Sequence, residues 1–182
     1  MKQKNSEFSK IIEINEISKK RPMVKTLVAE ASENISIAKR LNVNEVKGFS
    51  ANVKVSLKGA GVILVEANFK AEITQQCAIS LKPVKNQIET SFEAFFTEEK
   101  YELPVCENMA SIIPENDEEA PEYIDNGQID LGDLLVQHLS LEIDLFPKAE
   151  GADFSEVLEN NGIKNENNNP FSVLASLSKD ES

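Results

Sequence analysis

The chain has 182 residues, enough for one globular domain with a hydrophobic core but too few for two full-sized domains with tails. Its apolar fraction of 41% and charged fraction of 27% are those of an ordinary soluble protein. The net charge of −12 and the pI of about 4.6 argue against RNA as the sole partner, because nucleic-acid-binding domains normally carry a clustered basic excess.

The two parts of the chain differ in the sign of their charge. Residues 1–70 carry 13 basic and 7 acidic side chains, a net +6, whereas residues 71–182 carry 6 and 24, a net −18. A large acidic surface fits a basic protein partner, since opposite charge speeds the right encounter. Acidity that only confers solubility is the alternative.

The remaining composition excludes several classes of protein. Cys77 and Cys106 match no recognisable metal or redox spacing. The N-terminus lacks the apolar stretch of a signal peptide, and Glu66 interrupts the longest apolar run well short of a membrane span. We therefore expect a protein of the reducing cytoplasm with no membrane partner.

The first third of the chain predicts two strands and a helix. Loose alternation over 7–17 favours an opening strand, "KKRP" (19–22) is a basic break, and "TLVAEA" (26–31) favours a second strand. "ASENISIAKRLN" (31–42) then predicts a short helix with Ser32 as its N-cap. Its approximate apolar stripe consists of Ile35, Ile37, Ala38 and Leu41.

Residues 49–96 carry the clearest pattern in the chain. Apolar residues alternate with polar ones over 49–57 and again over 63–73, and "KGAG" (58–61) supplies the glycines of a tight turn between them. A third alternating run follows over 84–96. These runs predict a three-stranded antiparallel meander that needs helices or further strands on its apolar face. The expected fold class is α+β, with the sheet either a β-meander or a partly closed barrel.

The next segment predicts a solvated acidic loop and then a helix. Residues 107–129 contain seven carboxylates, two prolines and no Lys or Arg. Asp130 is the predicted N-cap of a helix with Asp133 at its third position. Leu131, Leu134, Leu135 and His138 share one face of that helix. Alternation over 141–145 predicts a short closing strand, ended by Pro147.

The domain organisation expected from these patterns is a single α+β domain over 1–150 and an Asn-rich flexible tail over 151–182. In the tail, "NPFSVLASL" (169–177) predicts a short helix with Asn169 as cap and Pro170 at the first position. Phe171, Leu174 and Leu177 fall on one face of it, typical of a short linear motif on a tether. A helix docked on its own domain is the alternative.

No catalytic or cofactor site emerges from the residue types. A Cys77–His138 nucleophile pair and a zinc site are both poor fits, and acidic neighbours would raise the thiol pKa or leave it unaffected. Nucleotide-binding loops are absent, and the carboxylates of 115–122 lack the spacing of a calcium loop. We expect no enzyme activity, no cofactor and no metal.

A second possible interface is basic. "KKRP" and "AKRLNVNEVK" (38–47) can approach RNA phosphate, although without interleaved aromatics. The candidate RNA-proximal residues are Lys19, Lys20, Arg21, Lys39, Arg40 and Lys47.

Four stretches together resemble a known family. They are "ASENISIAKRLNVNEVKGFSANVKV", "ANFKAEITQQCAISLKPVKNQIETSFEAFF", "IDNGQIDLGDLLVQHLSLEIDLFPKAEGADF" and the terminal "NPFSVLASL". In this order they resemble the YceD family of large ribosomal RNA subunit accumulation proteins, over about residues 7–177, in its alphaproteobacterial form. The resemblance implies a role in the synthesis, processing or stability of 23S rRNA, with no established activity.

The chain departs from that family at its cysteines. Many members carry a second cysteine soon after the first, and some carry a cysteine-rich C-terminal segment, whereas "CAISLKP" has one and "DLFPKAEGADF" has none. A metal role is therefore not carried over. Cys77 is interpreted as a buried turn residue that keeps the second and third strands in register, with Pro83 and Asp130 as further structural residues.

The sequence thus favours a non-enzymatic assembly factor for the large ribosomal subunit. Its expected partners are a basic large-subunit ribosomal protein, a 23S rRNA precursor particle, or both, and its oligomeric state stays open. The candidate partner-binding residues are Glu115, Asp117, Glu118, Glu119, Glu122, Asp125, Phe171, Leu174 and Leu177. A direct rRNA-binding module is the alternative, and a thiol- or metal-dependent enzyme is the least favoured.

Overall fold

The structure is a computed structural model that describes residues 8–98, 121–124 and 126–153. The described residues divide into two compact units, 8–75 with 85–98, 121–124 and 126–145, and 76–84 with 146–153. Its elements are β1 (Ile11–Glu13), η1 (Ile14–Glu16), β2 (Met23–Val28), α1 (Ala31–Arg40), β3 (Glu45–Leu57), η2 (Gly59–Gly61), β4 (Ile63–Gln76), β5 (Pro83–Thr97), β6 (Glu122–Tyr123), β7 (Gln128–Asp130) and α2 (Leu131–Leu141).

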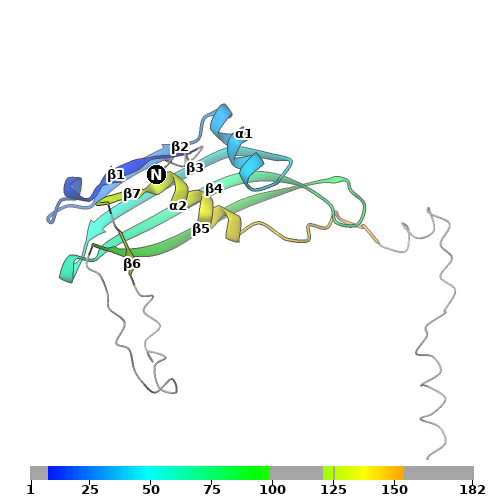
Figure 1. Cartoon of the computed structure of the whole chain (residues 1–182). Coiled ribbons are helices and arrows are strands. Elements are labelled where there is room, and N and C mark those ends of the chain that lie inside the picture. Colours follow the sequence, from blue (N-terminus) through cyan, green and yellow to red (C-terminus); the bar gives the residue numbers. More distant parts are fainter. Residues whose placement is uncertain (1–7, 99–120, 125, 154–182) are drawn as a thin grey trace, which may run out of the picture. The chain divides into compact units, whose positions relative to one another are not determined.

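The fold is α+β, as predicted, with a sheet of five strands in the order β2-β3-β4-β5-β6 (Figure 1). β2 and β4 pair antiparallel with β3, and the short β6 pairs parallel with β5. β1 and β7 form a separate two-stranded antiparallel sheet. The five-stranded sheet is open, so the meander forms and the partly closed barrel does not.

The central hairpin β3–β4 forms because both strands have an apolar face of period two. The register pairs Val53 with Ala67 and Val55 with Val65, which places apolar side chains of both strands on one buried face. Gly61 takes a φ of +72° at the turn, a conformation that glycine adopts without steric cost. The predicted hairpin is confirmed.

Four aromatic rings form a continuous row through the core. The ring centroids of Phe8 and Phe49 are 5.4 Å apart, and those of Phe49–Phe69 and Phe69–Phe92 are each 6.1 Å apart. The imidazole of His138 stacks on Phe92 at 3.5 Å between centroids. Aromatic pairs at this separation contribute beyond their buried area. The row links the N-terminal segment, three strands and α2, and it gives His138 a packing role.

Helix α1 begins two residues earlier than the predicted N-cap implies. Its N-cap is Glu30, not Ser32, and Ser32 lies inside the helix. The carboxylate of Glu33 accepts a hydrogen bond from the Glu30 backbone N–H at 2.8 Å, while the Glu30 side chain accepts from the N–H of Glu33, a reciprocal capping box. Because the box satisfies two backbone donors, it outweighs a single serine cap. Of the predicted stripe, Ile37 and Ala38 are buried and Ile35 is exposed.

Helix α2 begins where predicted, but the strand expected after it does not form. Asp130 caps α2, accepting hydrogen bonds from the backbone N–H groups of Gly132 and Asp133. The helix takes in Leu141 and ends at Glu142, whose backbone is helical. Leu141 and Leu145 are exposed, so the closing strand over 141–145 was a wrong prediction. Alternation over five residues is too short to distinguish a strand from a helix end and the bends after it.

Two further corrections concern short strands. Only residues 11–13 of the predicted opening strand are extended, and a 3-10 turn follows them. The predicted acidic loop over 107–129 includes β6 and the first two residues of β7. Both strands depend on partners far away in the sequence, which local patterning does not reveal. Neither described helix is long and apolar enough to cross a membrane.

Candidate interaction site at the basic end of the sheet

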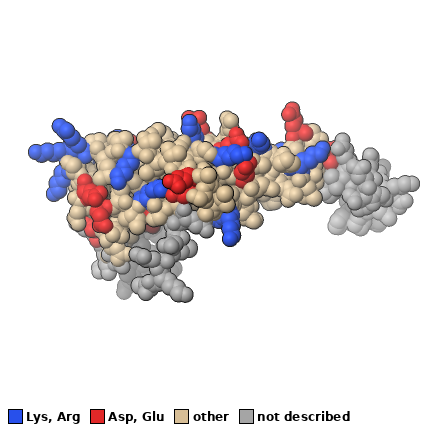
Figure 2. All heavy atoms as spheres, turned by 90° about the horizontal axis from the view of Figure 1, so that it is seen from above, with Lys and Arg blue, Asp and Glu red and all other residues tan. Residues whose placement is uncertain are grey.

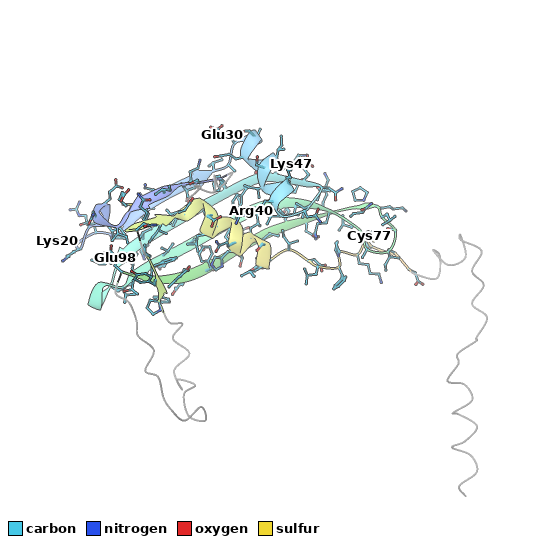
Figure 3. All side chains as sticks on the ribbon, in the orientation of Figure 1. Lys20, Glu30, Arg40, Lys47, Cys77 and Glu98 are labelled. Carbon is cyan, nitrogen blue, oxygen red and sulfur yellow. The ribbon has the colours of Figure 1, made fainter. Side chains whose placement is uncertain are left out.

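Four cations gather at one end of the five-stranded sheet, and we call this group the basic end: Lys19, Lys20, Arg21 and Lys58. The β2–β3 register explains their meeting. Met23 pairs with Val55, so the residues just before β2 and those just after β3 lie at the same end of the sheet. Figure 3 places Lys20 at this end, and in Figure 2 basic side chains gather there.

The loop that carries three of these cations is anchored at both ends. Ile17 is buried in the core, and β2 begins at Met23. Before the loop, the backbone N–H of Ile14 donates to the carbonyl of Gly127, and the Gln128 amide donates to the Glu13 carboxylate at 2.6 Å. The pairing of β1 with β7 therefore fixes where the basic loop starts.

The predicted RNA-proximal residues divide into two groups. Among the described residues, none of the four members of the basic end forms an ion pair. Arg40, by contrast, pairs with Asp133 at 2.6 Å, and Lys47 pairs with Glu45 at 2.8 Å. The hydrogen bond and charge of Glu45 raise the pKa of Lys47 above its ordinary value.

Strand β2 separates the two groups. Its six residues span about 20 Å, so Lys19–Arg21 and the cations of α1 and early β3 do not form one continuous surface. Lys39 is exposed beyond the far end of β2. The sequence analysis did not assign Lys58 to this surface, because Lys58 is not part of a basic run. Only the pairing of β2 with β3 brings it near Lys19–Arg21.

The described part of the chain is close to neutral. It contains 14 basic and 17 acidic side chains, a net −3, against −12 for the whole chain. Most of the negative charge therefore belongs to residues 99–120, 125 and 154–182. Of the predicted partner-binding residues, only Glu122 is described, exposed on β6. The others, Glu115, Asp117, Glu118, Glu119, Asp125, Phe171, Leu174 and Leu177, lie outside the described residues.

The uncovered face of the sheet carries a shallow polar groove of about 550 Å³. Hydroxyl and amide side chains line its centre, and the Thr26 hydroxyl donates to the Asn52 amide oxygen at 2.8 Å. Its one aromatic lining residue, Phe69, is buried in the core. Among the described residues, the groove offers hydrogen-bonding side chains and no exposed ring on which a base could stack.

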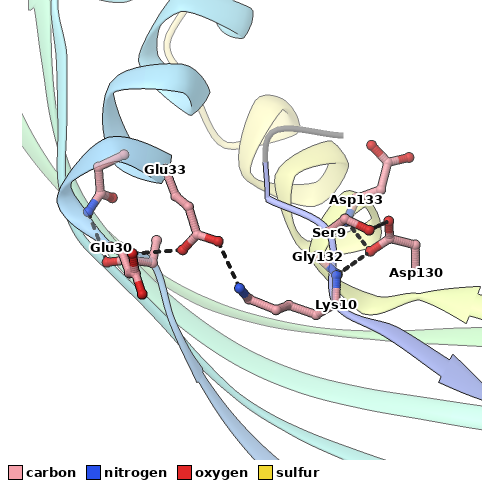
Figure 4. A network of polar contacts seen from close by, with 9 residues as sticks. Ser9, Lys10, Glu30, Glu33, Asp130, Gly132 and Asp133 are labelled. Carbon is pink, nitrogen blue, oxygen red and sulfur yellow. Dashed lines mark hydrogen bonds and ion pairs between the residues drawn. The ribbon is translucent and has the colours of Figure 1, made fainter. Parts of the chain in front are cut away.

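A network of polar contacts ties the N-terminal segment to both helices (Figure 4). The Asp130 carboxylate accepts from the Ser9 hydroxyl at 2.6 Å and from the Lys10 backbone N–H at 2.8 Å, besides capping α2. The Lys10 ammonium pairs with Glu33 of α1 at 2.7 Å. Burial raises the pKa of Glu33, but the hydrogen bonds from Lys10 and from the Glu30 backbone outweigh it and leave that pKa below its ordinary value. The network holds the segment that leads to the basic end.

Cys77 lies in the second unit, at the turn between β4 and β5. Its sulfur accepts hydrogen bonds from three backbone N–H groups, those of Ser80 and Ala149 at 3.3 Å and of Ile79 at 3.4 Å. Its own N–H donates to the Lys82 carbonyl at 2.8 Å. The side chain is fully buried, and Pro83 starts β5 directly after the turn. Cys77 is therefore a buried turn residue, and its role in keeping the two strands in register stays a prediction.

These contacts lower the pKa of the Cys77 thiol from 9.0 to about 6. The Ser80 hydroxyl lowers this pKa most, followed by the backbone N–H groups of Ser80 and Ala149. Burial raises the pKa, and the Ile79 N–H lowers it by a smaller amount. The sequence-based expectation of a raised or unaffected pKa was wrong, because the Ser80 hydroxyl, and after it the backbone N–H groups of Ser80, Ala149 and Ile79, stabilise the thiolate.

This lowered pKa predicts a pH-dependent stability. Between pH about 6 and 9 the unfolded chain binds more protons at Cys77 than the folded chain, so folding stability rises with pH through this window and the gain is lost as pH falls through 6. We expect urea midpoints in a Cys106→Ser background to rise over this range, and to rise less after the further change Cys77→Ser. Equal pH profiles for the two variants would contradict the assignment.

The described residues contain no cluster of three metal-ligating side chains. Its open five-stranded sheet and its two α-helices place the described part of the chain in the α+β class. Residues 65–178 match the YceD family, described as large ribosomal RNA subunit accumulation protein, and the chain belongs to that family. Membership connects the chain with the accumulation of large-subunit ribosomal RNA. Neither a curated protein nor a solved structure matches the chain.

Proposed function

We propose that this chain is a non-enzymatic cytoplasmic factor that supports 23S rRNA synthesis, processing or stability by binding a basic ribosomal protein or a precursor particle of the large subunit. The observation that carries this proposal is the separation of charge. The described fold has a net charge of −3, whereas most of the −12 belongs to segments outside it. Acidic segments attract basic ribosomal proteins, and the family membership supplies the ribosomal context.

The proposal is tested by neutralising the acidic segment and not by deleting it. Deletion of 107–129 would remove β6 and most of β7, which belong to the fold. We expect a variant with four neutralised carboxylates to bind its basic ribosomal protein at least about tenfold more weakly. Each neutralised carboxylate removes an electrostatic attraction to the basic partner and one of the contacts that align the two proteins. Isothermal titration against purified basic large-subunit proteins measures this. The four changes are Glu115→Gln, Asp117→Asn, Glu118→Gln and Glu119→Gln.

A matched control changes the net charge by the same amount elsewhere. Four exposed carboxylates of the described fold serve for this: Glu16→Gln, Glu89→Gln, Glu93→Gln and Glu142→Gln. We expect this variant to bind like the wild type. Equal weakening in both variants would show a nonspecific effect of net charge, and unchanged affinity in the acidic-segment variant would reject the acidic-segment mechanism.

The second candidate function is direct binding of rRNA, which the basic end favours because none of its four cations forms an ion pair with a described residue. Neutralising phosphates releases counterions, so the affinity of such a module falls steeply with salt. Changing Lys19, Lys20, Arg21 and Lys58 to Gln should then reduce the slope of log affinity against log salt by about 0.9 for each lost phosphate contact on duplex. A matched control changes Lys70, Lys82, Lys85 and Lys148 to Gln, four exposed lysines outside the candidate RNA-proximal set.

Capture of the tagged chain from gently lysed cells, with and without nuclease, distinguishes binding of a free basic ribosomal protein from binding of RNA or of a whole particle. A basic ribosomal protein that remains bound after nuclease supports protein binding. Loss of all partners after nuclease supports recognition of RNA or of a whole particle, and then the basic end is the surface to map.

A further inference from the structure

Strand β2 is an edge strand of the sheet that the described residues form. Within this part of the chain, β2 pairs with β3 and with no second strand. The backbone N–H of Ala29 donates to the Phe49 carbonyl, so the odd-numbered residues of β2 form the hydrogen-bonded pairs with β3. The backbone groups of Val24, Thr26 and Val28 consequently point away from β3, toward the outer edge, which forms the upper border of the sheet in Figure 1.

The side chains on this edge are open and mostly apolar. Val24 is 66% exposed and Val28 is 61% exposed, with the exposed Thr26 between them. Natural edge strands are usually protected by charges, bulges or prolines, and here Lys25 is the one charged residue of β2. The outer-face row of the strand carries no charge, so it does not repel a further strand.

We propose that β2 pairs antiparallel with β2 of a second copy of this chain, about a two-fold axis at Thr26. This register uses all three outward residues of each copy, because Val24 then faces Val28 of the second copy and Thr26 faces its counterpart. Each of these pairs exchanges both of its N–H···O bonds. A shift by two residues in either direction leaves at least one outward residue without a partner.

The side chains of the two copies are complementary in this register. Each Val24 lies across from a Val28 on the outer face, a favourable apolar cross-strand pair. On the other face Lys25 lies across from Leu27 of the second copy, so the two Lys25 charges do not oppose each other. Residues of the same type therefore face each other only where they are uncharged, as in the Val24–Val28 and Thr26–Thr26 pairs.

Charges beyond the strand ends also favour a second copy over another partner. Extending the register brings Lys19–Arg21 of one copy beside the start of α1 of the other copy, where Glu30 is exposed. The same contact occurs twice because the two-fold axis repeats it. The interface is short, well below the area of a standard stable interface, and we therefore expect a weak dimer.

The test compares two substitutions at Thr26 in the full chain. Proline removes the outward N–H without touching a β2–β3 hydrogen bond, and edge strands tolerate it at such positions. Alanine keeps the N–H and removes only the side-chain bond to Asn52. By sedimentation equilibrium we expect the wild type and Thr26→Ala to dimerise with rising concentration, and Thr26→Pro to dimerise at least about tenfold more weakly.

A charge reversal tests the register. Lys20→Glu with Arg21→Glu should weaken the dimer, more so at low salt, because these side chains would then repel Glu30 of the second copy. Circular dichroism and thermal unfolding verify that each variant is folded. A wild type that is monomeric up to millimolar concentration, or a folded Thr26→Pro variant that dimerises like Thr26→Ala, would overturn the proposal.

Discussion

Gly132→Ala is expected to destabilise the fold by about 3 kcal/mol, although the same change inside a helix normally stabilises it by about 1 kcal/mol. A Cβ at Gly132 would lie 2.0 Å from the Phe8 carbonyl oxygen and 3.0 Å from the Lys10 nitrogen. Both are backbone atoms that cannot rotate away. The N-terminal segment must therefore separate from α2, which breaks the Lys10–Asp130 hydrogen bond and loosens Phe8.

Urea unfolding monitored by circular dichroism measures this effect. Gly59→Ala is the matched control, since a Cβ at Gly59 meets nothing within 4 Å and we expect a change within about 0.5 kcal/mol. A Gly132→Ala variant as stable as the wild type would show that the Phe8 segment does not pack against α2.

Phe49→Ala is expected to cost about 3–5 kcal/mol, a large fraction of the total stability of a typical domain. Phe49 is fully buried, and its ring contacts the rings of both Phe8 and Phe69. The alanine would leave a cavity in the centre of the aromatic row, so the loss includes the removed contacts and the unfilled space. The same urea titration gives the free energy of unfolding.

The conservative variant Phe49→Leu should recover most of the lost stability, because it refills much of the volume without the aromatic contacts. A small loss for Phe49→Ala, near that of an exposed site, would place Phe49 at the surface. A loss for Phe49→Leu as large as that for Phe49→Ala would indicate that ring geometry, and not volume, decides the packing.

The parts of the fold that the sequence predicts are those set by local periodicity. The β3–β4 hairpin follows from alternation on both sides of a glycine turn, and α2 follows from Asp130 and the leucine stripe. The cap of α1 was misassigned because Ser32 is a good cap by type, whereas the reciprocal Glu30–Glu33 box was stronger. The parallel pairing of β6 depends on contacts between distant residues, which no local pattern encodes.

The candidate site was predictable only where its residues are consecutive. Lys19, Lys20 and Arg21 are visible as a basic run, but Lys58 joins them through strand register. The pairing of Arg40 with Asp133 spans 93 residues, so its charge appeared available from the sequence alone. The contact of the Ala149 N–H with the Cys77 sulfur spans 72 residues, and the lowered thiol pKa depends partly on it.

The parallel pairing of β6 with β5 also determines how freely the acidic part of the chain can vary. Phe96 pairs with Glu122 and Thr97 with Tyr123, so the two ends of the intervening stretch are held about 5 Å apart, the spacing of neighbouring strands. The chain entropy lost on closing such a loop grows only with the logarithm of its length, about 0.6 kcal/mol for each doubling. The number of residues that join Thr97 to Glu122 is therefore expected to influence the stability of the sheet only weakly, so a longer or shorter connection between β5 and β6 is compatible with the same sheet.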